Sequence, residues 1–294
     1  MNRLTRRNYF LAQKITPWLI LCIPMIFTLW LKYYPILKAV YISFFNYNPT
    51  NQPGEFVGLQ NYTTMFQTEY YWEAWGNSFV FLFLQIGMVF IIPIIQALFL
   101  NELRKKNVIS TMYLLPTLIP TTINVIIWRW VWHPDYGIAN QVMKLFGAEP
   151  QTWLSDPSLV KFCIIFPGVI GGGIAVLLYL SAIQGISPDI LESASLDGCT
   201  GWKRIWYITL PNIRFVIFIQ LVMSVSAAMQ MLDAPYMFAA GGPSGASTTQ
   251  GIYIYNAFNR DYNYGRGSAA SVVLMLVVLV MTMIQMHFEN AERE

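Results

Sequence analysis

The sequence predicts an all-α polytopic membrane protein whose helices cross the bilayer six times. Of its 294 residues, 55% are apolar and only 11% are charged, and the mean hydropathy is +0.46. Because a soluble domain carries roughly 25% charged residues, this composition excludes a water-soluble globule of this size. A helix needs roughly 20 apolar residues to cross a bilayer core about 30 Å thick. Six windows dominated by large apolar residues contain no Asp, Glu, Lys or Arg: 15–31, 74–101, 107–128, 162–188, 215–232 and 267–288.

From these windows we expect a cytoplasmic N-terminal tail over 1–16, one transmembrane domain over 17–288 and a cytoplasmic tail over 289–294. A seventh charge-free window, 234–259, contains GGPSGASTTQ, which is too rich in Gly, Ser and Thr for a lipid-facing helix. We therefore exclude it as a span. The expected spans are about 17–45, 77–100, 108–132, 160–183, 214–232 and 268–288, with a cytoplasmic loop over 184–213.

The first span resembles a signal peptide, because four basic residues precede its apolar run. LKYYPILKAVY follows without a small-x-small cleavage site, so we interpret the segment as an uncleaved signal-anchor. With the N-terminus inside, eleven Lys and Arg residues fall in inner segments and six in outer ones, while Arg129 lies near the outer end of the third span. This excess predicts a multi-pass membrane protein with both termini in the cytoplasm.

Composition also argues against three other classes of protein. The net charge is only +3 and the basic residues fall in short clusters, which is not typical of nucleic-acid binding. The three cysteines form no C-x-x-C pair, so no disulfide framework is indicated. The two histidines, His133 and His287, are far apart, so there is no ligand pattern for a metal site.

The cytoplasmic loop 184–213 predicts two short helices. Ser187 and Pro188 suit a helix start, and Gly198 suits the following stop. Ile190, Leu191 and Ala194 fall on one face of this first helix. We expect the second helix to run from Thr200 to about Ile208 and to be stopped by Pro211. An apolar face outside the bilayer requires a partner or the headgroup layer.

The same loop contains Glu192-Ser193-Ala194-x3-Gly198-x9-Ile208-x-Leu210-Pro211. This resembles the EAA loop of bacterial ABC importer permeases, E-A-A-x3-G-x9-I-x-L-P, and departs from it only in having Ser at the second position. Asp197 before Gly198 is typical of the carbohydrate branch. In that family the first helix inserts into a groove of the ATPase. The resemblance therefore implies an ATPase-coupling role for Glu192, Ser193, Ala194, Asp197, Gly198, Ile208, Leu210 and Pro211.

Other segments, in the same order along the chain, resemble the maltose and glycerol-phosphate permease family: YYP at 33–35, FVGLQNY at 56–62, WRWVWHPDYGIAN at 128–140, GGP at 241–243 and YG at 264–265. The resemblance covers nearly the whole chain and implies a type I ABC importer permease fold with a cytoplasmic coupling helix. It also implies a second permease subunit, an ATP-binding subunit dimer and an extracytoplasmic solute-binding protein as partners.

The chain lacks a G-x-x-x-x-G-K-[ST] loop for phosphates. Gly171, Gly172 and Gly173 have no following Lys, and with Gly168 they suit a close helix–helix contact. We therefore expect a non-catalytic subunit without a cofactor of its own, whose partner ATPase binds ATP and Mg.

Polar residues inside spans usually face a bundle interior or a pathway. Amides and hydroxyls suit a sugar, and hydrogen bonds between helices are the alternative explanation. A disaccharide, an oligosaccharide, a uronate oligomer and glycerol-3-phosphate all remain open as substrates, and we favour an oligosaccharide. The candidate pathway residues are Gln85, Asn124, Tyr179, Ser224 and Gln230.

Two other functions compete with this interpretation. Gly242-Pro243-Ser244-Gly245 matches the G-x-S-G of rhomboid proteases, but a helix of about 20 residues, near 30 Å long, separates Ser244 from His287. A hydrogen bond between Ser and His needs about 3 Å. A channel or secondary transporter not driven by ATP would show repeated halves, broken helices or an acid at mid-membrane. No Asp or Glu lies near the centre of any expected span.

Overall fold

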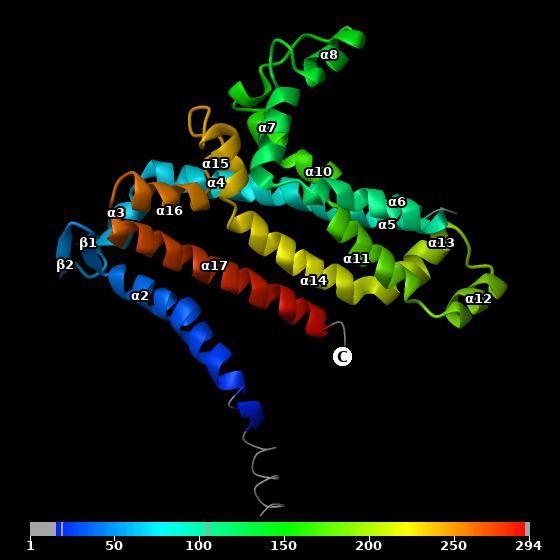
Figure 1. Ribbon diagram of the computed structural model, residues 1–294, viewed down its shortest axis with the longest axis horizontal. Helices are drawn as coiled ribbons and strands as arrows, with labels where there is room; N and C mark the ends of the chain where they lie inside the picture. The colour runs from blue at the N-terminus through cyan, green and yellow to red at the C-terminus, as the bar shows by residue number, and fades with distance from the viewer. Residues whose placement is uncertain (1–15, 19, 104–105, 292–294) are drawn as a thin grey trace, which may run out of the picture. The chain divides into compact units, whose positions relative to one another are not determined.

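The computed structural model describes residues 16–18, 20–103 and 106–291 (Figure 1). The chain divides into two compact units, which we describe separately. One consists of Met1–Met65 and Ala257–Val273, and the other of Phe66–Asn256 and Leu274–Glu294.

In the first unit, a candidate membrane span over Thr16–Ile42 includes η1 (Leu29–Tyr33) and α2 (Tyr34–Ile42). The helix ends at Ile42, shortly before the expected end of the span near Phe45. The chain turns instead into an antiparallel hairpin of β1 (Phe45–Asn48) and β2 (Asn51–Phe56), which α3 (Gln60–Phe66) follows. The Asn61 side-chain amide donates to the carbonyl oxygens of Ser43 (2.8 Å) and Phe45 (2.9 Å), so it satisfies the backbone where the helix has ended.

Three further helices are long and apolar enough to cross a membrane. α4 (Glu69–Leu84), η2 (Gln85–Phe90) and α5 (Ile91–Glu102) form one continuous helix. A second consists of α13 (Trp202–Arg204), η5 (Ile205–Thr209) and α14 (Leu210–Met229), and the third is α17 (Tyr264–Ala291). Within the described residues, the candidate spans number four, or six if each of two bent helix pairs counts as one span.

The two bent pairs correct the expectation of continuous helices over 108–132 and 160–183. α6 (Lys106–Leu114) with η3 (Leu115–Leu118) meets α7 (Thr121–Val131) at 94°. α9 (Val160–Ile165) with α10 (Pro167–Gly171) meets α11 (Gly173–Gln184) at 47°. Pro120 causes the first break, because proline lacks an N–H and holds the preceding residue in an extended conformation. The second break falls at Gly172. Glycine stabilises a helix less than other residues do, because it loses more conformational freedom on folding.

The remaining helices are short. They are α8 (Ile138–Leu145), η4 (Trp153–Ser155), α12 (Pro188–Leu196), α15 (Asp233–Ala239) and α16 (Gln250–Asn259). As expected, 234–259 is not a span. It consists of α15, a turn with a cis Gly242–Pro243 peptide bond and α16.

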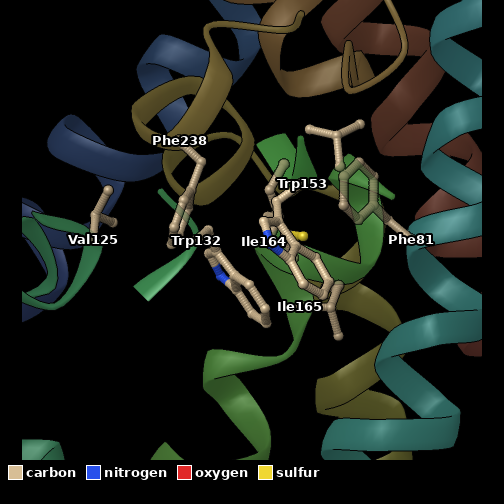
Figure 2. Packing of buried hydrophobic residues seen from close by; sticks show 9 residues of the cluster. Phe81, Val125, Trp132, Trp153, Ile164, Ile165 and Phe238 are labelled. Carbon is tan, nitrogen blue, oxygen red and sulfur yellow. The ribbon is translucent and has the colours of Figure 1, made fainter. Parts of the chain in front are cut away.

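Two clusters of buried side chains lie within the second unit. The Trp153 cluster (Figure 2) consists of Phe81, Val125, Trp132, Trp153, Val160, Cys163, Ile164, Ile165 and Phe238. The Tyr179 cluster consists of Ala97, Leu100, Val176, Tyr179, Leu180, Ile183, Ile186 and Ile213. Three spans contribute one end to each cluster: α4 and α5, α7 and α6, and α9 and α11.

The helix irregularities of these three spans lie together between the two clusters. α10 packs against both η2 and η3. The approach depends on small residues. A Cβ on Gly168 would lie 2.8 Å from a methyl group of Val89 in η2, and a Cβ on Gly173 would overlap the Tyr113 carbonyl oxygen of α6. We call η2, η3 and α10 the break layer.

Candidate functional site

The candidate coupling helix α12 has a well-defined start. The Ser187 hydroxyl accepts a hydrogen bond from the Asp189 N–H at 3.3 Å, and Pro188 occupies the first turn, where a missing N–H has no consequence. In Figure 1, α12 lies beyond the ends of α11 and α14, away from the packed helices of its unit. The start of the helix therefore agrees with the sequence prediction.

Glycine at position 198 is required by the end of the same helix. The Gly198 N–H donates to the Ser195 carbonyl (3.1 Å) and the Cys199 N–H to the Ala194 carbonyl (2.8 Å), which together form a Schellman motif. In this motif the residue after the cap takes a left-handed conformation, and Gly198 has φ of +73°. The glycine of the motif thus fixes the C-terminal end of the helix.

α12 presents its acidic residues to the outside. Ala194 is 6% exposed and Leu191 packs against the Tyr179 cluster, whereas Glu192, Ser193 and Asp197 are exposed. Ile190, expected on the face of Leu191 and Ala194, is 41% exposed, so that face is narrower than predicted. In the part of the chain that the structure describes, neither acidic side chain of the motif has an ion-pair partner. α12 is thus a short, doubly capped helix with two unpaired carboxylates.

The expected stop at Pro211 is wrong. The helix that begins at Trp202 runs through the π-helical turn η5 and continues without a break as α14. Pro211 is tolerated inside this continuous helix because the wider π-helical turn η5 comes directly before it, and the Asn212 side-chain amide donates to the Ile208 carbonyl at 2.7 Å. Leu210 packs against the Tyr179 cluster. The second half of the motif therefore forms the N-terminal end of a span, which we call the base of α14.

One ion pair joins this base to another span. The Arg204 guanidinium lies 2.6 Å from the Glu102 carboxylate at the last residue of α5. The Arg204 side chain is 33% exposed and the Glu102 side chain 64% exposed. No local sequence pattern signals this contact, because the two residues are separated by 102 positions.

The candidate pathway residues are spread over both ends of the second unit. Tyr179 belongs to the Tyr179 cluster, and Asn124 is next to Val125 of the Trp153 cluster. Gln85 begins η2, and π-helical turns are frequent at functional sites. The hydroxyls of Tyr179 and Ser224 are buried and lack a hydrogen-bond partner among the described residues. Gln230 is exposed at the end of α14.

A buried polar network that the sequence analysis missed fixes the turn between α15 and α16 to α4. The Asn77 side-chain amide donates to the carbonyls of Gly245 and Thr248, both at 2.9 Å. The Gln250 N–H donates to the Ser78 hydroxyl (3.0 Å), and the Gln250 side chain donates to the Tyr71 carbonyl (3.0 Å). Asn77 and Ser78 are adjacent polar residues near the start of an apolar window. This pairing is the sequence signal from which their role could have been inferred.

Replacing Asn77 with alanine is expected to release this turn. The substitution removes two hydrogen bonds between α4 and the turn, which costs about 2 kcal/mol, while the Gly245 carbonyl keeps the Thr248 N–H as a donor. Thermal unfolding in detergent should show the lower stability, and limited proteolysis should cut the chain near Ser244, which is exposed. Asn46→Ala, in the exposed part of β1, is the matched control. Equal proteolysis of both variants would contradict the assignment.

The sequence model of the family described as "Binding-protein-dependent transport system inner membrane component" matches residues 74–294. The chain is 30% identical over 241 residues to the trehalose/maltose transport system permease protein MalF of Thermococcus litoralis, covering 81% of each chain. It is also 29% identical over 289 residues to the probable ABC transporter permease protein YurN of Bacillus subtilis, covering 96% of this chain and 98% of that protein.

Among solved structures, a chain from a bacterial ABC transporter involved in the import of the acidic polysaccharide alginate superposes with a TM-score of 0.85. The match covers 97% of this chain and 99% of that chain at 24% sequence identity. At this identity the likeness shows the fold alone. The predicted type I importer permease fold is thereby confirmed.

Proposed function

Because this chain belongs to the family of binding-protein-dependent transport system inner membrane components, we propose that it couples a separate ATPase to the import of an oligosaccharide. Membership confirms the predicted family and the role of a multi-pass transmembrane permease subunit, which is a transport component. In our proposal it forms half of the translocation pathway, and a second permease subunit forms the other half.

The observation that carries the coupling proposal is the construction of α12. A soluble ATPase can displace a membrane helix only through an element stiff enough to move as a unit. α12 is capped at both ends and exposes Glu192 and Asp197. Its buried side, through Leu191, contacts the Tyr179 cluster. A force on α12 therefore acts first on α5, α11 and the base of α14.

We propose alternating access as the mechanism, and the separation of the Tyr179 cluster from the Trp153 cluster supports it. When the two ATP-binding subunits close, they draw the coupling helices together, and the Tyr179 cluster moves with α12. The break layer separates this cluster from the Trp153 cluster, and three spans are already bent or wound irregularly there. The ATPase binds ATP and Mg, since this chain has no phosphate-binding loop. The residues of this chain supply the mechanical connection.

We propose an oligosaccharide as the substrate and a solute-binding protein as its donor. The relative at 30% identity is named for trehalose and maltose, and the matched structure is named for alginate import. The candidate pathway residues Gln85, Asn124, Tyr179, Ser224 and Gln230 are neutral, which suits the hydroxyl groups of a sugar. We place both termini in the cytoplasm, with α12 on the same side.

Purification of this chain from its native membranes in mild detergent, with mass spectrometry of the co-eluting proteins, tests the proposal. We expect a second six-span permease and a P-loop ATPase to co-elute. The recovered complex in liposomes should then take up labelled oligosaccharide only with ATP and the loaded binding protein. A chain that elutes alone and transports without ATP would instead be a channel or secondary carrier.

A further inference from the structure

The loop that carries α12 rejoins the membrane helices through a short exposed segment. Between the end of α12 and the start of α13, Gly198, Thr200 and Gly201 are exposed, so no buried side chain there ties the segment to a span. Gly198 and Gly201 have φ of +73° and +56°, in the positive range that favours glycine. The helix then passes through the π-helical turn η5, and turns of this kind are frequent at functional sites. A displacement of α12 can therefore be absorbed here before it acts on a span.

The Glu102–Arg204 ion pair joins the C-terminal end of this loop to α5. Arg204 is the last residue of α13, directly before η5, and Glu102 is the last residue of α5. Their N–O separation of 2.6 Å is that of a charge-assisted hydrogen bond. α5 also contributes Ala97 and Leu100 to the Tyr179 cluster. The pair thus connects the exposed C-terminal end of the loop to the same group of helices that Leu191 contacts from α12.

We propose that Glu102 and Arg204 are positioning residues for energy coupling: their ion pair ties the C-terminal end of the coupling loop to α5, so that α12 and the membrane helices move together. This inference rests on the proposed function. Without the pair, ATP hydrolysis continues while part of each displacement is lost between Gly198 and η5. Both side chains are partly exposed, so the pair contributes little to folding stability and its variants should assemble.

The test compares single and reciprocal variants in the reconstituted complex with its ATPase and binding protein. Arg204→Gln and Glu102→Gln should each lower the number of sugars transported per ATP hydrolysed by ~3-fold or more, a change typical of residues that modulate coupling between sites. The reciprocal variant, Glu102→Arg with Arg204→Glu, should restore most of the ratio. Raising the salt concentration should lower the wild-type ratio toward that of the single variants, because salt screens exposed pairs.

Lys203→Gln is the matched control, since it removes the neighbouring exposed positive charge. It should leave the ratio unchanged. An unchanged ratio in both single variants would overturn the proposal, and so would a reciprocal variant no better than the singles. A loss of assembled complex with a normal ratio would show a purely structural role and would also overturn it. Failure of the proposed function itself would appear separately, as absence of ATP-dependent uptake by the wild-type complex.

Discussion

Replacing Glu192 with lysine is expected to abolish coupled transport while the protein still inserts into the membrane. Glu192 is exposed in the middle of α12, and lysine is a good helix former, so the helix should persist. A reversed charge at a protein interface costs about 2–5 kcal/mol. Both ATP-driven uptake and substrate-stimulated ATP hydrolysis should therefore fall by about 30-fold or more. Proteoliposomes containing the whole complex provide both readings.

Glu149→Lys is the control for this charge reversal. Glu149 is exposed between α8 and η4, in a segment that we place on the opposite side of the membrane from α12. It should transport normally. Normal uptake by Glu192→Lys, with the complex intact, would contradict the proposal that α12 couples the ATPase to transport.

The second large effect is expected from Gly173→Ala. A Cβ at this position would overlap the Tyr113 carbonyl oxygen, and a backbone atom cannot move aside as a flexible side chain does. α6 and α11 must separate to accommodate the methyl group, which costs about 3 kcal/mol for overpacking of this kind. We expect a lower yield of folded protein and a lower melting temperature in detergent, measured by size-exclusion chromatography and thermal unfolding.

Gly76→Ala is the matched control, because nothing lies within 4 Å of the position that its Cβ would take in α4. It should be neutral or slightly stabilising, since alanine has the higher helix propensity. Equal stability of the two alanine variants would show that α6 and α11 do not pack as described.

Hydropathy was sufficient to locate the apolar segments, and local capping chemistry was sufficient for α12. Both depend on neighbouring residues along the chain. The continuation of the helix past Pro211 was not predictable from neighbouring residues. Proline stops a helix that approaches it from the N-terminal side unless the preceding turn widens, and the widening occurs in η5. The contacts of Asn77 and the Glu102–Arg204 pair join distant segments, so they depend on the assembled fold.

The broken helices change one argument made from the sequence. Breaks in spans were expected of a secondary transporter, yet two candidate spans of this permease are bent by 94° and 47°. The bends follow from Pro120 and from the glycines around Gly172, which also allow close packing with neighbouring helices. Helix breaks therefore do not separate these two classes of transporter. The spacing of the EAA motif from Glu192 to Pro211 is the more informative feature.

Site-specific photo-crosslinking from Leu196 in native membranes tests the docking of α12 most directly. The Leu196 side chain is 90% exposed on the last turn of α12, and Leu145, at the end of α8, is 84% exposed and serves as the control. We predict that a photoreactive residue at 196 crosslinks to an ATP-binding protein and that one at 145 does not. Crosslinking from 196 only to lipid, or to the ATP-binding protein from both positions, would contradict the account.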